Sequence, residues 1–289
     1  MTSHTPPSAP APAPVPAPSA GRAGRNLPAA IASAVVLLAL IAGSLYFWKP
    51  AFVAVVTAAI LVGVWELKRS FAVKGIALPY EPIMVGAVVM LVGAYVGGAP
   101  ALVTAMAVTA LASLLWRLRG GVDGFVRDAT AAVFTSAYVP FLAGFVMLLL
   151  KPEDGPLRVL TFILVTIASD IGGYFVGVLA GRHPMAPLVS PKKSWEGFAG
   201  STVFCVAAGW AAVVFLLDGE WWVGVVLGLV AVVMATLGDL CESVIKRDLG
   251  IKDMSSVLPG HGGLMDRLDS LLATVAPLWL LLFYLVPVS

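Results

Sequence analysis

Long apolar runs constrain the fold of this chain more than any other feature. A helix needs about 20 apolar residues to cross a hydrocarbon core of about 30 Å. Nine segments approach or exceed that length, with predicted limits 27–48, 50–66, 83–99, 100–116, 128–150, 157–181, 197–217, 221–238 and 268–288. Since 60% of the residues are hydrophobic and only 12% are charged, the sequence predicts an all-α, polytopic integral membrane protein with about nine transmembrane helices.

The basic residues are distributed unevenly between the two sides that these runs imply. With the N-terminus inside, only three fall outside: Lys49, Lys151 and Arg158. Fifteen fall inside: Arg22, Arg25, Lys68, Arg69, Lys74, Arg117, Arg119, Arg127, Arg182, Lys192, Lys193, Lys246, Arg247, Lys252 and Arg267. Cytoplasmic loops carry the excess of Lys and Arg. We therefore expect the N-terminus and the loops around residues 182–193 and 246–267 to face the cytoplasm.

Residues 1–26 differ in kind from the rest of the chain. Seven prolines interleave with alanine between Pro6 and Pro18, which predicts a disordered, solvated cytoplasmic tail without chemistry of its own. The tail has no basic start followed by an apolar stretch, so we expect the first run to act as an uncleaved insertion signal. The remainder divides into N-terminal transmembrane helices, 27–155, and a C-terminal region, 156–289, which carries the motifs described next.

Charged residues of both signs gather near the C-terminus. Ionised groups are expensive in lipid, so this concentration needs a reason. From Asp239 to Leu249 nothing breaks a helix, and Gly250 follows as a C-terminal cap. Pro259 and the three glycines after it exclude regular structure, and a second helix is expected to start near Leu264. The segment therefore predicts a helix, a glycine loop and a second helix, placed before the last span.

The residue types in this segment suit a nucleoside triphosphate. Asp239, Ser243 and Lys246 share one helix face, at spacings of four and three, and Asp266 and Asp269 lie on the second helix. Carboxylates hold Mg²⁺, which completes its shell with water and substrate phosphates. Glycines bring backbone N–H groups close to phosphates. A solvated loop would explain scattered Lys and Arg, but not a glycine loop with flanking carboxylates.

The segment resembles the signature of the phosphatidate cytidylyltransferases, the CDP-diacylglycerol synthases of phospholipid synthesis. The matching residues are Ser243, Lys246, Arg247, Lys252, Asp253, His261, Gly262, Gly263, Asp266, Arg267 and Asp269. A second block, 190–197, resembles the S-P-K-K-[ST]-x-E-G loop of that family. Residues 169–174 resemble a third block, in which Ile171-Gly172 is a looser match. The region of resemblance runs from about residue 169 to 272.

The resemblance implies that CMP passes from CTP to phosphatidate, giving CDP-diacylglycerol and pyrophosphate. It points to Asp239 and Asp266 as ligands of Mg²⁺, with Asp269 beside them. The residues expected to meet the phosphates of CTP are Lys246, Arg247, Lys252, His261, Gly262, Gly263 and Arg267. The residues expected to receive the lipid phosphate are Ser190, Lys192 and Lys193. Ser243 and Asp170 complete the expected substrate-binding set.

The resemblance also sets the expected surroundings of the protein. CTP, phosphatidate and the lipid bilayer are the expected partners, with no nucleic acid among them. A second, monovalent cation and a homodimer are allowed by the resemblance, although the residues themselves indicate neither. The expected location is the plasma membrane of a bacterium, with the active site on the cytoplasmic side.

Two acidic residues within the apolar runs have expectations of their own. Asp170 lies eleven residues before Gly181, about 16 Å inside its span at 1.5 Å per residue. It is either a protonated or hydrogen-bonded packing residue, or part of a polar cavity that opens to the site. Glu66 follows Trp65 at the end of the second run, where we expect it to lie at the membrane interface.

Other function classes explain less of the sequence. A CTP-dependent polyprenol or phytol kinase would use a similar site but transfer the γ-phosphoryl group, and its product would be CDP. A membrane transporter would explain nine spans and a buried Asp170, but not the glycine loop with its charged neighbours. A CDP-alcohol phosphotransferase is disfavoured because its D-G-x-x-A-R core is absent.

Overall fold

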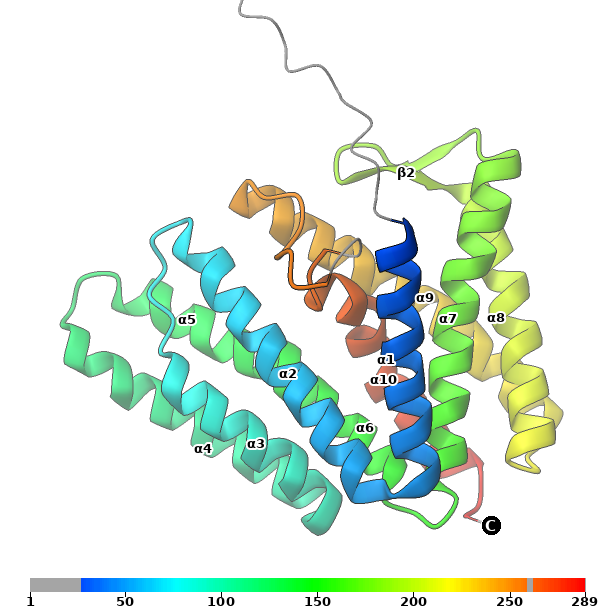
Figure 1. Cartoon of the computed structure of the whole chain (residues 1–289), viewed down its shortest axis with the longest axis horizontal. Helices are drawn as coiled ribbons and strands as arrows, with labels where there is room; N and C mark the ends of the chain where they lie inside the picture. Colours follow the sequence, from blue (N-terminus) through cyan, green and yellow to red (C-terminus); the bar gives the residue numbers. More distant parts are fainter. Residues whose placement is uncertain (1–26, 259–261, 289) are drawn as a thin grey trace, which may run out of the picture.

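The computed structural model describes residues 27–258 and 262–288, with side chains from residue 35 onward. The predicted tail, 1–26, and His261 lie outside the described residues. Ten α-helices follow one another along the described chain (Figure 1): α1 (Leu27–Phe47), α2 (Lys49–Ala72), α3 (Tyr80–Gly97), α4 (Ala99–Arg117), α5 (Phe125–Ser136), α6 (Leu142–Leu150), α7 (Gly155–Ala180), α8 (Trp195–Leu216), α9 (Trp221–Leu249) and α10 (Met265–Leu285).

Among the described residues, eight helices are long and apolar enough to cross a membrane. One of these spans, Phe125–Leu150, joins α5 and α6 through a π-helical turn, Ala137–Phe141, that contains Pro140. The first predicted run corresponds to α1, whose described apolar part, Val35–Phe47, is shorter than a span. The helices occur in the predicted order. The prediction of an all-α, polytopic membrane protein is therefore confirmed.

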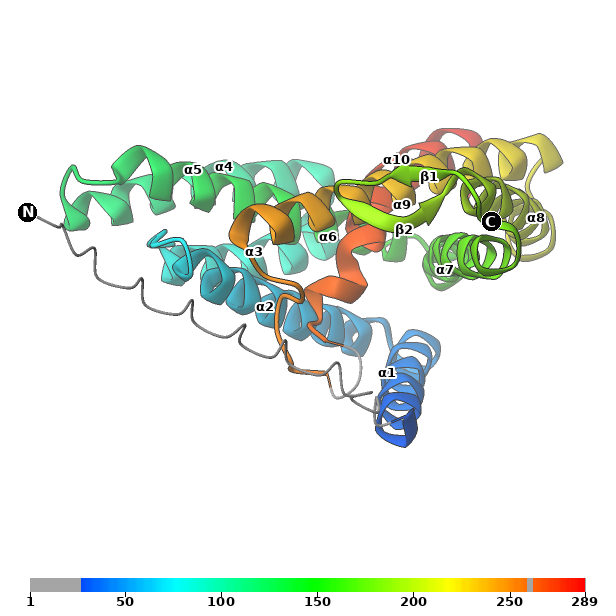
Figure 2. The same cartoon turned by 90° about the horizontal axis from the view of Figure 1, so that it is seen from above.

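The helices form two groups with a central pair between them. Seen from above, α3, α4 and α5 gather on one side and α7 and α8 on the other, with α9 and α10 between (Figure 2). Helix α9 packs on both α8 and α10, and α6 packs on α10. The buried core runs continuously from α2 through α10. Residues from both halves of the chain therefore surround the start of α10.

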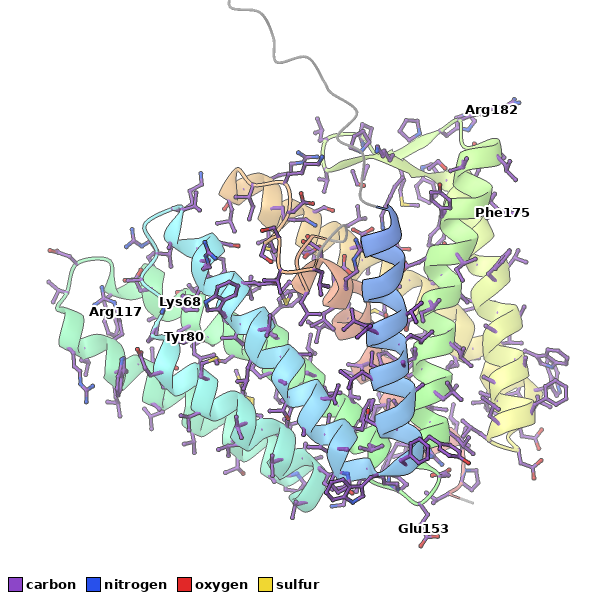
Figure 3. All side chains as sticks on the ribbon, in the orientation of Figure 1. Lys68, Tyr80, Arg117, Glu153, Phe175 and Arg182 are labelled. Atoms are coloured by element: carbon purple, nitrogen blue, oxygen red, sulfur yellow. The ribbon has the colours of Figure 1, made fainter. Side chains whose placement is uncertain are left out.

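The bundle has two distinct ends. Arg182 and Glu153 lie at opposite ends (Figure 3), and we call the end that carries Arg182 and the C-terminal end of α9 the site end. The basic residues predicted to lie outside gather at the other end. Lys49 Nζ donates a hydrogen bond to the Pro152 carbonyl, and Lys151 Nζ donates one to the Val96 carbonyl at 2.9 Å.

The predicted loop at 190–197 contains the second strand of a β-hairpin and the start of a helix. Strand β2 (Ser190–Ser194) pairs antiparallel with β1 (Pro184–Ala186), and α8 begins at Trp195. Ser194 caps α8, because its Oγ accepts a hydrogen bond from the Gly197 N–H at 3.1 Å. Side-chain oxygens at this position satisfy N–H groups that lack partners in the first helical turn. The hairpin holds the two lysines of the motif in an extended segment.

A buried charge of opposite sign anchors each end of α10. At its C-terminal end the Arg158 guanidinium donates to the carbonyls of Leu282 (2.9 Å) and Val286 (3.0 Å). At its N-terminal end the Glu66 carboxylate accepts from the N–H groups of Leu264 (2.9 Å) and Met265 (2.7 Å). A carboxylate at the N-terminus and a cation at the C-terminus both complement the helix dipole.

Glu66 is buried within the protein, with an exposed fraction of 0%, although the sequence pointed only to a position at the membrane interface. Helix α10 begins below the ends of α2 and α9 (Figures 1 and 2). The described residues between α9 and α10, 250–258 and 262–264, therefore turn back into the bundle beside α2, and we call them the returning loop. That returning loop covers Glu66. Hydropathy along the second run carries no information about it.

Candidate active site

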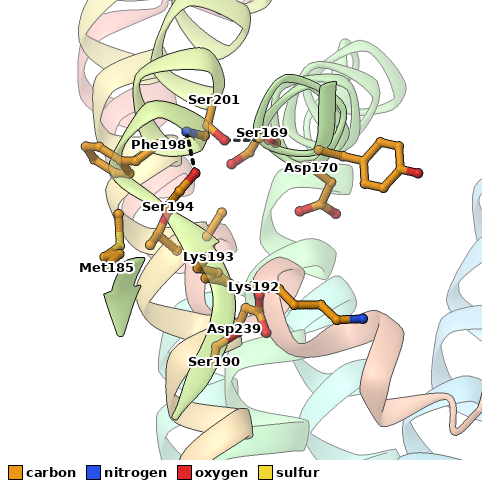
Figure 4. Close-up of a pocket in the computed structure, with 15 residues that line it drawn as sticks. Ser169, Asp170, Met185, Ser190, Lys192, Lys193, Ser194, Phe198, Ser201 and Asp239 are labelled. Atoms are coloured by element: carbon orange, nitrogen blue, oxygen red, sulfur yellow. Dashed lines mark hydrogen bonds and ion pairs between the residues drawn. The ribbon is translucent and has the colours of Figure 1, made fainter. Parts of the chain in front are cut away.

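A cavity of about 320 Å³ opens between α7, α8, α9 and β2. It brings together five of the predicted site residues from three separate parts of the sequence (Figure 4): Asp170, Ser190, Lys192, Lys193 and Asp239. Ser169 lines it too, and the Ser169 carbonyl accepts a hydrogen bond from Ser201 Oγ at 2.6 Å. Asp170 thus borders a polar cavity, which favours the second of its two interpretations.

Lys193 and Asp239 join the hairpin to α9. Lys193 Nζ lies 2.6 Å from Asp239 Oδ2, and the side chains keep 25% and 37% of their surfaces exposed. Ser243 Oγ donates to the other Asp239 oxygen at 3.4 Å, as expected for residues one turn apart on the same face. Because Asp239 remains partly open, its carboxylate can reach a ligand in the cavity.

Lys246 lies between two carboxylates. Its Nζ is 2.7 Å from Glu242 Oε2 and 2.8 Å from Asp266 Oδ1. The second Asp266 oxygen accepts from the N–H groups of Met254 (3.0 Å) and Gly263 (2.8 Å). Lys246 therefore contacts two protein carboxylates, and its contact with CTP phosphates stays a prediction. Asp266 is held in one position by a lysine and by two backbone donors.

In the described part of the glycine loop, the Gly263 N–H donates a hydrogen bond to Asp266 Oδ2 at 2.8 Å. A contact between this loop and phosphate stays a prediction. A Cβ added at Gly263 would meet Asp266 Oδ2 at 2.9 Å and Glu66 Oε1 at 3.1 Å. Gly262 has φ 83°, a left-handed conformation that favours glycine. These two glycines let the backbone pass close to two carboxylates.

One further carboxylate, that of Asp269, is buried near Glu242 and Asp266, and we call these three residues the carboxylate cluster. Glu242 is 0% exposed and Asp269 is 7% exposed. The sequence analysis missed Glu242, although it lies three residues after Asp239 and four before Lys246. That spacing places it on the same helix face, so helical periodicity could have identified it. Glu242 Oε1 is buried and has no hydrogen-bond partner among the described residues.

The charged residues of α7, β2, α9 and α10 act on one another. Asp170 interacts electrostatically with four charged side chains, those of Asp239, Asp269, Lys193 and Arg267. Arg247 and Lys252 are exposed, the first near the end of α9 and the second in the loop that follows. The cavity and the carboxylate cluster are thus parts of one charged site.

The carboxylates of the site are the residues that could bind a metal ion. Within residues 27–258 and 262–288, no three His, Cys, Asp or Glu side chains form a compact group that could hold a metal. Lys193 and Lys246 instead hold Asp239 and Asp266. The donors are carboxylate oxygens, which suit Mg²⁺. A nearby cation would also satisfy the orphaned Glu242 Oε1, since buried polar atoms normally have a partner. The type of donor atom therefore suits Mg²⁺, and the ligand assignment stays a prediction.

Comparison with known proteins gives a consistent result. The model of the cytidylyltransferase family matches residues 28–285. The phosphatidate cytidylyltransferase of Mycobacterium leprae is 42% identical over 281 residues, covering 90% of this chain and 89% of the relative. That of Mycobacterium bovis is 39% identical and covers 90% of each chain. That of Haemophilus influenzae is 38% identical over 150 residues, or 48% of this chain and 52% of the relative.

Proposed function

This chain belongs to the cytidylyltransferase family, and we propose that it transfers CMP from CTP to phosphatidate, giving CDP-diacylglycerol and pyrophosphate. The observation that carries the proposal is the cavity in which Lys193 pairs with Asp239 beside Asp170 and Lys192. Such a site can receive two phosphate-bearing substrates. It belongs to a multi-pass membrane protein, so a lipid can reach it from the bilayer.

The reaction brings two anions together. A phosphate oxygen of phosphatidate attacks the α-phosphorus of CTP, and a new P–O bond forms. The bond from the α-phosphorus to the oxygen that bridges to the β-phosphate breaks, and pyrophosphate leaves with that electron pair. A phosphate monoester is already a nucleophile. The protein therefore contributes mainly positioning and charge neutralisation.

The described side chains divide this work. Asp239 and Asp266, with Asp269 beside them, would hold Mg²⁺, which when bound offsets phosphate charge. Lys193 and Lys246 keep Asp239 and Asp266 in position. Contacts with the phosphates of CTP are assigned to Arg247, Lys252, His261, Gly262 and Arg267, but not to Gly263, whose N–H donates to Asp266. Ser190 and Lys192 are assigned to the lipid phosphate, because both line the cavity.

The product of the reaction tests this function. Purified protein is incubated with phosphatidate, Mg²⁺ and CTP labelled in the cytosine ring, and in a parallel reaction with CTP labelled at the γ-phosphate. We expect the ring label to enter a CDP-lipid and the γ-label to leave as pyrophosphate. In a further reaction with a polyprenol in place of phosphatidate, a γ-label that enters the lipid, with CDP as the second product, would instead identify a kinase.

Lys192 provides a test of the lipid-phosphate assignment. It is exposed and lines the cavity, whereas Lys193 already pairs with Asp239. Lys192→Ala should raise the apparent KM for phosphatidate more than that for CTP, since a lost charge-assisted contact of about 1.5–3 kcal/mol lowers kcat/KM by about 10- to 150-fold. Lys68→Ala is the matched control, because Lys68, on α2, lies over the ring of Tyr80, on α3, and does not line the cavity. Equal changes in both KM values would contradict the assignment.

The site end is assigned to the cytoplasm, on the strength of the basic residues gathered there and the presence of CTP in that compartment. In a Cys241→Ser background, a cysteine at exposed Ser256 should react with an impermeant maleimide only from the cytoplasmic side. A cysteine at exposed Glu153 should react only from the opposite side. Labelling of both from one face would contradict this topology. The plasma membrane location and a homodimer also remain proposals.

A further inference from the structure

We propose that Glu66 is a positioning residue, which fixes the start of α10 and the returning loop and thereby places Asp266 and Asp269. Glu66 belongs to α2, far from the signature in sequence. Its carboxylate accepts hydrogen bonds from the Leu264 and Met265 N–H groups and from Ser255 Oγ. A fully buried carboxylate needs donors of this kind. All three come from the signature segment.

The start of α10 depends on this carboxylate for its cap. Leu264 occupies the N-cap position and makes no side-chain cap hydrogen bond. Helix N-termini leave several N–H groups without partners, and the residue at the N-cap usually supplies an acceptor. Here Glu66 supplies it from another helix. The residue after Met265 is Asp266, and Asp269 follows one turn later.

Three residues on one face of α2 contact the returning loop and the start of α10. Gly63, Glu66 and Ser70 lie at spacings of three and four, so they share one side of the helix. A Cβ at Gly63 would meet the Met265 Sδ at 3.1 Å, and Ser70 Oγ donates to the Met254 carbonyl at 3.3 Å. Glu66 lies between these two contacts. The N-terminal half of the chain thus takes part in building the site, although the sequence placed the site entirely within 156–289.

The direct test replaces the carboxylate by an amide of the same shape. In Glu66→Gln, an NH₂ group would replace one of the two oxygens that accept hydrogen bonds from Ser255, Leu264 and Met265, so that two donors would face each other. We expect kcat for CDP-lipid formation to fall by about 10- to 100-fold, because small displacements of reacting groups cost that much. The apparent KM for phosphatidate should change little. Hydrogen exchange at the Leu264 and Met265 amides should become at least about tenfold faster, as expected when local protection is lost.

The matched control is Asp128→Asn, which also converts a buried carboxylate to an amide. Asp128 accepts from Arg117 Nε and from the Ala77 N–H, away from the signature segment. It should leave both kcat and the exchange at Leu264 and Met265 unchanged. Glu66→Asp, which keeps the charge on a shorter side chain, should recover part of the lost activity.

The kcat measurements for Glu66 rest on the proposed function, but the experiment distinguishes a failure of the Glu66 role from a failure of that function. Wild-type kcat in Glu66→Gln, with or without faster exchange, would overturn the positioning role. Equal effects of Asp128→Asn would also overturn it. If the wild-type protein forms no CDP-lipid, the proposed function fails, and the exchange rates alone decide whether Glu66 holds the loop. If Glu66→Gln does not fold, Ser255→Ala removes one donor and should lower kcat by about three- to tenfold; an unchanged kcat there overturns the inference.

Discussion

Asp239→Asn and Asp266→Asn should each lower the turnover of CTP and phosphatidate by about a thousandfold or more, while the protein stays folded. Each change removes a negative oxygen that is proposed to bind Mg²⁺. A bound metal contributes several kcal/mol of charge stabilisation, and about 4 kcal/mol corresponds to about a thousandfold in rate. The measurement is CDP-lipid formation by purified protein at saturating CTP. Size-exclusion profiles and thermal unfolding in detergent report on the fold.

Both variants should stay folded, because each lysine that loses its aspartate partner can still interact with another carboxylate or with water. After Asp266→Asn, Lys246 still has Glu242, and after Asp239→Asn, Lys193 is exposed enough to be solvated. Asp128→Asn is again the control, since it removes a buried carboxylate outside the site. A variant with near-wild-type turnover at ordinary Mg²⁺ concentration would remove that aspartate from the metal site.

Lys246→Met should abolish activity and lower the free energy of unfolding by about 3–5 kcal/mol, because removing one partner of a buried ion pair leaves an uncompensated charge. Lys246 is only 16% exposed and binds both Glu242 and Asp266. Without it, these carboxylates and Asp269 would repel one another in a buried site. Denaturation in detergent and the rate of CDP-lipid formation measure the two effects.

Three variants check the reason for this loss. Lys246→Arg keeps the charge and should retain part of the stability. Glu242→Gln added to Lys246→Met should restore part of it, because it removes one of the stranded negative charges. Arg247→Ala, at the exposed neighbouring position, should change the unfolding free energy by less than about 0.5 kcal/mol. A fully stable Lys246→Met protein would show that the two carboxylates do not depend on Lys246.

Local patterns predicted the elements well. Helix α9 continues through Leu249 and ends at Gly250, which has φ 73° and caps the helix as expected. Helix α10 begins at Met265, one residue from the predicted start. These features depend on helix propensity and on the left-handed conformation that glycine adopts at low cost, and both are written in a few adjacent residues.

The pairing of charges followed less closely from the sequence. Lys246 was expected to contact phosphate, yet it binds Glu242 and Asp266. The block at 190–197 was expected to be a loop, but part of it is strand β2, which carries Lys193 to Asp239. Charge types were therefore evident from the sequence, while their partners depend on which elements pack side by side.

The sequence by itself determined the membrane class, the order of the helices and the segment that holds the site, because hydropathy and capping are local properties. Only the tertiary structure decided that Glu66 is buried beneath the returning loop, that Lys193 pairs with Asp239, and that the N-terminal half contributes to the site. The physical reason is that a buried charge is stabilised by whatever donors the fold brings within about 3 Å. For Glu66 those donors lie nearly two hundred residues further along the chain.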